Sequence, residues 1–130
     1  MTDVIITQSQ QIDDAIRAAL GHVPLQSLVA GRRVAVKPNE TWASSDDTTG
    51  ITQPDTLRAV LRAIKQYEPR ELIVTGGAGA AETEDVFRVG GLMDVVRAER
   101  AEFVDHNRPP FVSVDLEYRP SAKSQVRSRR

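Results

Sequence analysis

The sequence alternates between two kinds of apolar pattern from residue 32 to residue 105. Short runs rich in valine and isoleucine, typical of strands, are followed by longer stretches whose apolar residues recur every three or four positions, as on one face of a helix. The expected strands lie in RRVAVKP, ELIVT and AEFVDHN, and the expected helices in TQPDTLRAVLRAIKQYEP, AETEDVF and LMDVVRAER. This order predicts an α/β fold, a three-layer sandwich in which helices flank a mainly parallel sheet.

Two more patterned segments flank this region. Residues 11–20 place apolar side chains at helical spacing and predict an amphipathic helix. Residues 110–118, PFVSVDLEY, alternate apolar and polar side chains and predict an antiparallel strand at the sheet edge. The length favours one domain, residues 1–118, and the basic, apolar-poor tail 119–130 is expected to be disordered.

The composition excludes several chemistries. The chain has no cysteine, which excludes disulfides, thiol catalysis, zinc–thiolate sites and cysteine-ligated iron–sulfur clusters. The net charge of −1 gives no electrostatic bias toward nucleic acid or an anionic membrane. No apolar run approaches the roughly 20 residues that cross a bilayer, and MTDVIITQSQ lacks the pattern of a secretion signal. We therefore expect a cytoplasmic protein.

Polar segments follow all three expected strands, namely KPNETW, TGGAGAAET and DHN. In open parallel sheets the carboxyl ends of the strands meet at one edge, and ligands bind there. We therefore predict a binding site for a small anionic ligand at this edge. Its candidate ligand-binding residues are Lys37, Asn39, Gly76, Gly77, Gly79, Asp105 and Asn107.

The glycine segment allows two interpretations. Gly76, Gly77 and Gly79 lie between a strand and a helix, where bare backbone N–H groups can bind an anion. Asp105 ends the next strand, where a dinucleotide-binding fold would bind a ribose. However, GAGAAE lacks the third small residue of the dinucleotide fingerprint, no GKS or GKT follows, and acidic residues lie where a pyrophosphate would bind. A tight strand-to-helix turn without a ligand is the alternative.

Other candidates have a functional and a structural interpretation. Lys37 can bind a carboxylate or phosphate, act as a base if it is desolvated, or extend from a strand end into solvent. Asn39 can contact the ligand or its own loop, and Trp42 can stack on a planar ligand or pack its loop against the domain. Asp46 and Asp47 can bind a divalent cation, but adjacent carboxylates without a third ligand favour a solvated loop, so no metal site is predicted.

His106 follows Asp105 at a strand end, where it can serve in acid–base chemistry or be an exposed histidine without a catalytic role. No serine lies in a nucleophile-elbow motif, and no HExxH pair occurs. The sequence therefore specifies neither a reaction nor catalytic residues, and it leaves open whether the chain is an enzyme.

The order of these motifs resembles the family known as domain of unknown function 362. The similar segments, which span about residues 32–118, are VAVKPN, TQPDTLRAVLRAIKQYEPRELIVTGGAG, EDVFRVGGLMDVV, AEFVDHN and PFVSVDLEY. The resemblance implies an α/β domain whose biochemistry is unsettled. Some longer members carry ferredoxin-like cysteine clusters, which this cysteine-free chain cannot supply. A more distant similarity to the N-terminal part of nickel-pincer lactate-racemase-type enzymes implies a sheet-edge cleft for a nucleotide-derived cofactor, with no catalytic residue carried over.

We therefore expect a cytoplasmic α/β domain that binds a small anionic or nucleotide-like ligand at the carboxyl edge of its sheet. Lys37 would supply charge, Asn39 and Asn107 orienting hydrogen bonds, and the glycines backbone donors. The alternative is a non-catalytic interaction or half-module that a partner chain or a homodimer completes, which leaves homo-oligomer formation open. The sequence does not identify the ligand or any cofactor.

Overall fold

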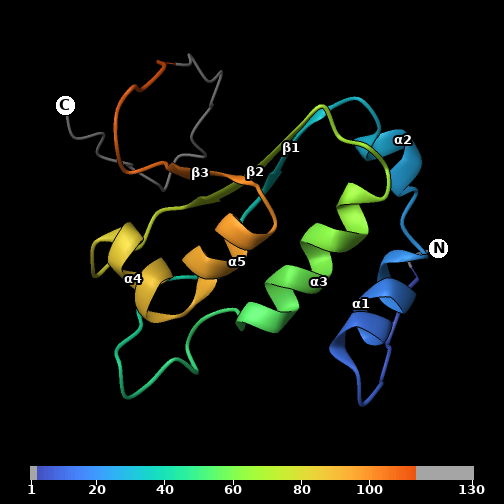
Figure 1. Ribbon diagram of the computed structural model, residues 1–130, viewed down its shortest axis with the longest axis horizontal. Coiled ribbons are helices and arrows are strands. Elements are labelled where there is room, and N and C mark those ends of the chain that lie inside the picture. The colour runs from blue at the N-terminus through green and yellow to red at the C-terminus, as the bar shows by residue number, and fades with distance from the viewer. Residues whose placement is uncertain (1–2, 114–130) are drawn as a thin grey trace, which may run out of the picture.

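The computed structural model describes residues 3–113 of the chain (Figure 1). Its elements, in chain order, are α1 (Ile12–Leu20), α2 (Leu25–Val29), β1 (Arg33–Val36), α3 (Pro54–Lys65), β2 (Glu71–Gly76), α4 (Thr83–Val89), α5 (Leu92–Ala98) and β3 (Glu102–Asp105). All lie where the apolar pattern predicts them except the short α2, which was not predicted. Residues 110–113 form no strand; the rest of the predicted strand 110–118 and the tail 119–130 lie outside the described residues.

The sheet consists of three parallel strands in the order β1-β2-β3. Val36 of β1 lies opposite Val74 of β2, and Gly76 of β2 lies opposite Asp105 of β3. The carboxyl ends of the strands therefore meet at one edge of the sheet. The predicted α/β class with a mainly parallel sheet is confirmed.

Helices α3, α4 and α5, which connect the strands, pack against one face of the sheet (Figure 1). Helix α1 packs against α3. Of the three predicted layers, residues 3–113 thus describe the sheet and the helical layer on one of its faces. None of the helices in this part of the chain is long and apolar enough to cross a membrane.

The core lies between the helices and the sheet. Leu61 of α3, Phe87 of α4 and Leu92 of α5 are fully buried against Val74 of β2. The ring of Phe87 packs on the ring of Phe103 in β3, with 4.8 Å between the centroids. Burying one large apolar side chain stabilises a fold by about 1.5–3 kcal/mol, so this cluster fastens α4 and the loop before it to the sheet.

Two glycines separate α4 from α5. Gly90 ends α4, and Gly91 has a φ of +72°, a left-handed conformation that a side chain disfavours. A Cβ at Gly90 would lie 2.2 Å from Cδ1 of Ile51, so this glycine also permits a close contact with the loop before α3. The interruption in the helical pattern is therefore a bend between two short helices.

Candidate functional site

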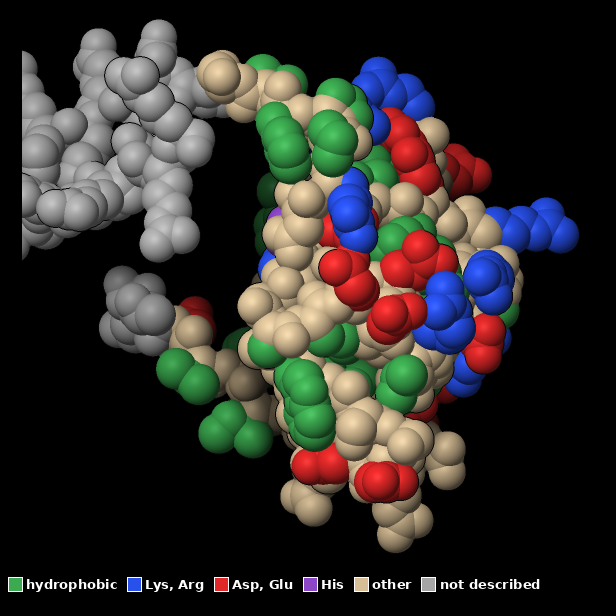
Figure 2. Space-filling view, turned by 90° about the vertical axis from the view of Figure 1, so that its left-hand side faces the viewer, with side chains coloured by type: hydrophobic (Ala, Val, Ile, Leu, Met, Phe, Trp, Pro, Cys, Tyr) green, Lys and Arg blue, Asp and Glu red, His purple; other side chains and the backbone are tan. Residues whose placement is uncertain are grey.

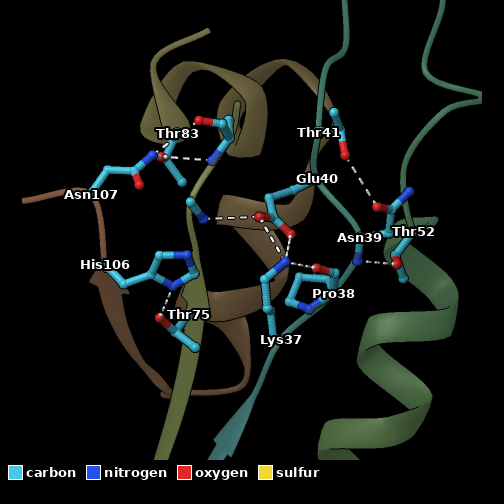
Figure 3. Close-up of polar contacts among 12 residues, drawn as sticks. Lys37, Pro38, Asn39, Glu40, Thr41, Thr52, Thr75, Thr83, His106 and Asn107 are labelled. Atoms are coloured by element: carbon cyan, nitrogen blue, oxygen red, sulfur yellow. Dashed lines mark hydrogen bonds and ion pairs between the residues drawn. The ribbon is translucent and has the colours of Figure 1, made fainter. Parts of the chain in front are cut away.

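Three segments meet at the carboxyl edge of the sheet: the chain after β1, the loop between β2 and α4, and the turn after β3 (Figure 3). The backbone N–H of His106 donates to the carbonyl oxygen of Gly76 at 2.9 Å and joins the second segment to the third. The first and second are joined through a carboxylate. The parallel strand order thus brings together polar segments that are far apart in the sequence.

Lys37 pairs with Glu40, a residue outside the predicted set. Lys37 Nζ donates to the two carboxylate oxygens of Glu40 at 3.0 and 2.9 Å and to the Pro38 carbonyl oxygen at 3.3 Å. The backbone N–H of Gly77 donates to the same Glu40 carboxylate at 2.9 Å. The side chain of Glu40 is 2% exposed and that of Lys37 is 53% exposed. Lys37 and Gly77 together therefore already bind an anion, which the chain itself supplies.

Asn39 fastens the loop that carries Glu40. Its backbone N–H donates to Thr52 Oγ1 at 2.9 Å, and its Nδ2 donates to the Gly50 carbonyl oxygen at 2.7 Å. The Thr52 N–H donates back to the Asn39 carbonyl oxygen at 2.9 Å. Asn39 thus bonds its own loop, which is the structural interpretation predicted for it.

The three predicted glycines have different surroundings. A Cβ at Gly76 would lie 2.6 Å from Phe87 Cε2, so Gly76 permits close packing of α4 on the sheet. A Cβ at Gly77 would lie 1.9 Å from His106 Nε2, whereas the same position at Gly79 faces open space. Of the three, Gly77 is the one whose N–H donates to a carboxylate.

Asn107 and Asp105 shape the glycine loop from the β3 side. Asn107 Nδ2 donates to the Ala78 carbonyl oxygen at 3.0 Å, and Thr83 Oγ1 accepts from the Ala78 N–H at 3.2 Å. Asp105 Oδ1 accepts from the Asn107 N–H at 2.9 Å, and its Oδ2 lies 3.7 Å from Arg108 Nε. Asp105 and Asn107 therefore both lie at the carboxyl edge of the sheet, and the polar atoms named above contact other residues of the chain.

His106 pairs with Thr75 rather than with its neighbour Asp105. His106 Nδ1 lies 3.2 Å from Thr75 Oγ1, and that hydroxyl donates to the Val104 carbonyl oxygen at 2.8 Å. His106 follows the last residue of β3, and its ring lies beside Thr75 of β2, whereas Asp105 accepts from the Asn107 N–H within the turn. Among the contacts of residues 3–113, the His106 ring is therefore paired with Thr75 and not with Asp105.

Negative charge surrounds the start of α4. Glu82 pairs with Arg108, and Glu84 and Asp85 each lie 2.8 Å from a guanidinium nitrogen of Arg88. These carboxylates occupy the helix end that would otherwise attract a pyrophosphate. Figure 2, which faces the carboxyl ends of the strands, shows acidic and basic side chains mixed over this surface rather than one basic patch. The dinucleotide interpretation of the glycine segment therefore gains no support.

The loop 39–53 also contains Trp42 and the two adjacent aspartates. Trp42 is 48% exposed, so a large part of its ring faces solvent. Asp47 accepts hydrogen bonds from the side chain and the backbone of Thr49, and these lower the pKa of Asp47. Asp46 does not join it in a cluster: within residues 3–113, no three His, Cys, Asp or Glu side chains are grouped to bind a metal ion.

Sequence reasoning missed Glu40 and Thr75. Glu40 lies three positions after Lys37, but an acid–base spacing of three is informative on a helix and not in a loop that follows a proline. Its second partner, Gly77, is 37 positions away. Thr75 appears in the sequence as an ordinary strand residue, and only the strand register places it beside Val104 and the turn that carries His106.

Fold and site together define an α/β domain with a polar sheet edge of the kind at which such folds bind ligands. A family model, Domain of unknown function (DUF362), matches residues 34–127, and the chain belongs to this family. The resemblance predicted from the motif order is thereby confirmed. Neither a search of curated proteins nor a search of solved structures returns a match.

Proposed function

We propose that the chain is a cytoplasmic domain that binds a small anionic or nucleotide-like ligand at the carboxyl edge of its sheet. One observation supports the proposal: Lys37 Nζ and the Gly77 N–H converge on a single carboxylate, that of Glu40. An ammonium group and a bare backbone N–H are common protein donors to carboxylate and phosphate groups. The anionic group of the ligand takes the place of the Glu40 carboxylate.

Exchange of this kind is compatible with where the three residues lie. Glu40 belongs to the loop between β1 and α3, whereas Lys37 and Gly77 directly follow strands of the sheet. Movement of the loop removes the carboxylate and leaves the two donors in place. The ligand competes with an internal carboxylate. Its apparent affinity is therefore its intrinsic affinity multiplied by the fraction of molecules in which Glu40 has moved away. The ligand therefore needs contacts beyond its anionic group.

A thermal-shift screen with nucleotides and phosphorylated metabolites tests the proposal. A ligand that binds only the folded state stabilises it by about 2.7 kcal/mol at a hundredfold excess over Kd. Lys37→Met should abolish the shift of any hit. Lys65→Met is the matched control, because Lys65 also pairs with a buried glutamate, Glu99, at 3.1 Å, but lies at the end of α3. A screen in which no anion stabilises the wild type overturns the proposal.

Glu40→Gln distinguishes exchange from binding beside an intact ion pair. The amide keeps the size of the side chain and can still accept from the Gly77 N–H, but it does not neutralise Lys37. Charge-assisted hydrogen bonds contribute about 1.5–3 kcal/mol, so the variant should bind inorganic phosphate at least about tenfold more tightly than the wild type. Equal or weaker binding, measured by calorimetry, rules out exchange.

A second candidate function is an interaction module that a second copy of the chain completes. Phe111 and Val112 are 69% and 86% exposed and line a groove of about 770 Å³ beside β3. Sedimentation equilibrium tests this candidate function. We expect the wild type to be a dimer and Phe111→Ser to be a monomer. A wild-type protein that stays monomeric at high concentration excludes it.

A further inference from the structure

The hydrogen bonds of Thr75 determine which nitrogen of His106 carries the hydrogen. A threonine hydroxyl has one hydrogen, and Thr75 donates it to the Val104 carbonyl oxygen at 2.8 Å. His106 Nδ1 lies 3.2 Å from the same hydroxyl oxygen. Because the hydroxyl makes the shorter contact with Val104, we assign the hydrogen between Thr75 Oγ1 and the ring to Nδ1. The neutral ring of His106 then has its lone pair on Nε2, which is a hydrogen-bond acceptor.

Nε2 of His106 faces the glycine loop. A Cβ at Gly77 would lie 1.9 Å from Nε2. Standard bond lengths separate a Cβ from its own backbone nitrogen by no more than about 3 Å, so Nε2 lies within about 5 Å of the Gly77 nitrogen. Figure 3 shows the imidazole and the Glu40 carboxylate on either side of this loop. Among residues 3–113, the hydrogen-bond contact of the His106 ring is made by Nδ1, and His106 itself is exposed.

We infer that His106 Nε2 accepts a hydrogen bond from the ligand, so that the site selects anions that also carry an O–H or N–H donor. This inference rests on the proposed function, because the ligand whose anionic group is bound by Lys37 and Gly77 has to extend past the glycine loop to reach His106 with its donor group. The two ends of the site then have opposite hydrogen-bonding roles. Lys37 and Gly77 donate to the anionic group of the ligand, and His106 Nε2 accepts from its O–H or N–H group. A nucleoside monophosphate carries both groups, in its phosphate and its ribose hydroxyls.

The tautomer is tested first and needs no ligand. NMR of protein labelled at the histidine nitrogens distinguishes a ring protonated at Nδ1 from one protonated at Nε2. The neutral His106 ring should be the Nδ1–H form in the wild type, and Thr75→Val, which removes the hydroxyl at nearly the same volume, should weaken that preference. An Nε2–H ring in the wild type overturns the inference.

The ligand contact is tested with AMP and its 2′,3′-dideoxy analogue, which lacks both ribose hydroxyls. The wild type should bind AMP about fivefold more tightly, the effect of one neutral hydrogen bond. His106→Ala should bind both probes equally, and His22→Ala, the matched control at the other histidine, should keep the wild-type preference. Equal binding of the two probes by the wild type overturns the inference and leaves the proposed function standing. If the wild type binds no anion of the screen, both fall.

Discussion

The Glu40 carboxylate lies 2.9 Å from the backbone nitrogen of Gly77, although 37 positions separate the two residues. This contact joins the segments that follow β1 and β2. The same buried carboxylate neutralises the charge of Lys37. A buried charge is tolerated only when it is paired and hydrogen-bonded. Glu40 therefore stabilises the edge of the sheet in the protein without a ligand.

Glu40→Ala should lower the free energy of unfolding by about 2 kcal/mol, because it leaves the Gly77 N–H without its acceptor and removes the two carboxylate bonds of Lys37. Urea denaturation measures the loss. Glu71→Ala is the matched control: Glu71 pairs with Arg33 at 2.7 Å but is 34% exposed, and such a pair contributes at most about 1 kcal/mol. Equal losses in the two variants would show that the buried contact adds nothing.

Gly77→Ala should displace the His106 ring. The added methyl group overlaps Nε2, so the ring has to turn away and lose its contact with Thr75. We expect a loss of about 1 kcal/mol in the free energy of unfolding and a changed nitrogen signal of His106. Gly79→Ala meets open space and should be neutral or stabilise by up to about 1 kcal/mol. Matching behaviour of the two variants contradicts the assigned position of His106.

The free energy of unfolding should depend on pH through Glu99. Burial by itself would raise the pKa of this carboxyl group, but hydrogen bonds from Lys65 and Arg62, together with their positive charges, hold the pKa below its ordinary value of 4.5. A carboxyl whose pKa is lower in the folded state contributes stability above its unfolded pKa and loses it as the pH falls through the folded value. The contribution of Glu99 should therefore be complete above pH 4.5 and decline below it.

Urea denaturation across the acid range measures this decline. Glu99→Gln should be less stable than the wild type at neutral pH, and its difference from the wild type should shrink on acidification. Glu84→Gln removes an exposed carboxylate that lies 2.8 Å from Arg88, and it should keep the wild-type pH profile. A constant difference between Glu99→Gln and the wild type at all pH values contradicts the assignment.

The sheet and its helices could be predicted because their signals are local. A valine-rich run, or a helical spacing such as that of Leu57 and Leu61, is visible within one element. The alternation of strands and helices along the chain then predicts a parallel sheet. The location of the candidate site follows from the same topology, since parallel strands end at one edge. Helix α2 escaped prediction because its five residues, LQSLV, are too few to show a period.

The partners within the site could not be predicted, because the contacts that define them span long stretches of chain. Lys37 was expected to offer a free charge, and no local feature shows that Glu40 turns inward to neutralise it. The pairing of His106 with Thr75 likewise depends on the register of β2 with β3. Hydrogen bonds between distant segments are fixed by the packed fold and leave no spacing pattern in the sequence.

Phe87 supports the edge of the sheet from beneath. It is fully buried, packs on Phe103, and lies where a Cβ of Gly76 would be only 2.6 Å from its ring. Phe87→Ala should cost about 3–5 kcal/mol, whereas Phe87→Leu, which leaves a smaller cavity, should cost less and remain folded. Val89→Ala is the exposed control on the same helix, since Val89 is 46% exposed.

The milder variant tests whether the core and the candidate site are coupled. A cavity under Gly76 should loosen the chain beside it, so the Gly77 amide hydrogen, which Glu40 accepts, should exchange with solvent faster in Phe87→Leu than in the wild type. Hydrogen-exchange NMR under native conditions measures this rate, with the amide of Ala35 in β1 as a reference within the sheet. An unchanged Gly77 rate in a destabilised Phe87→Leu protein would mean that the Glu40 contact is independent of the packing below it.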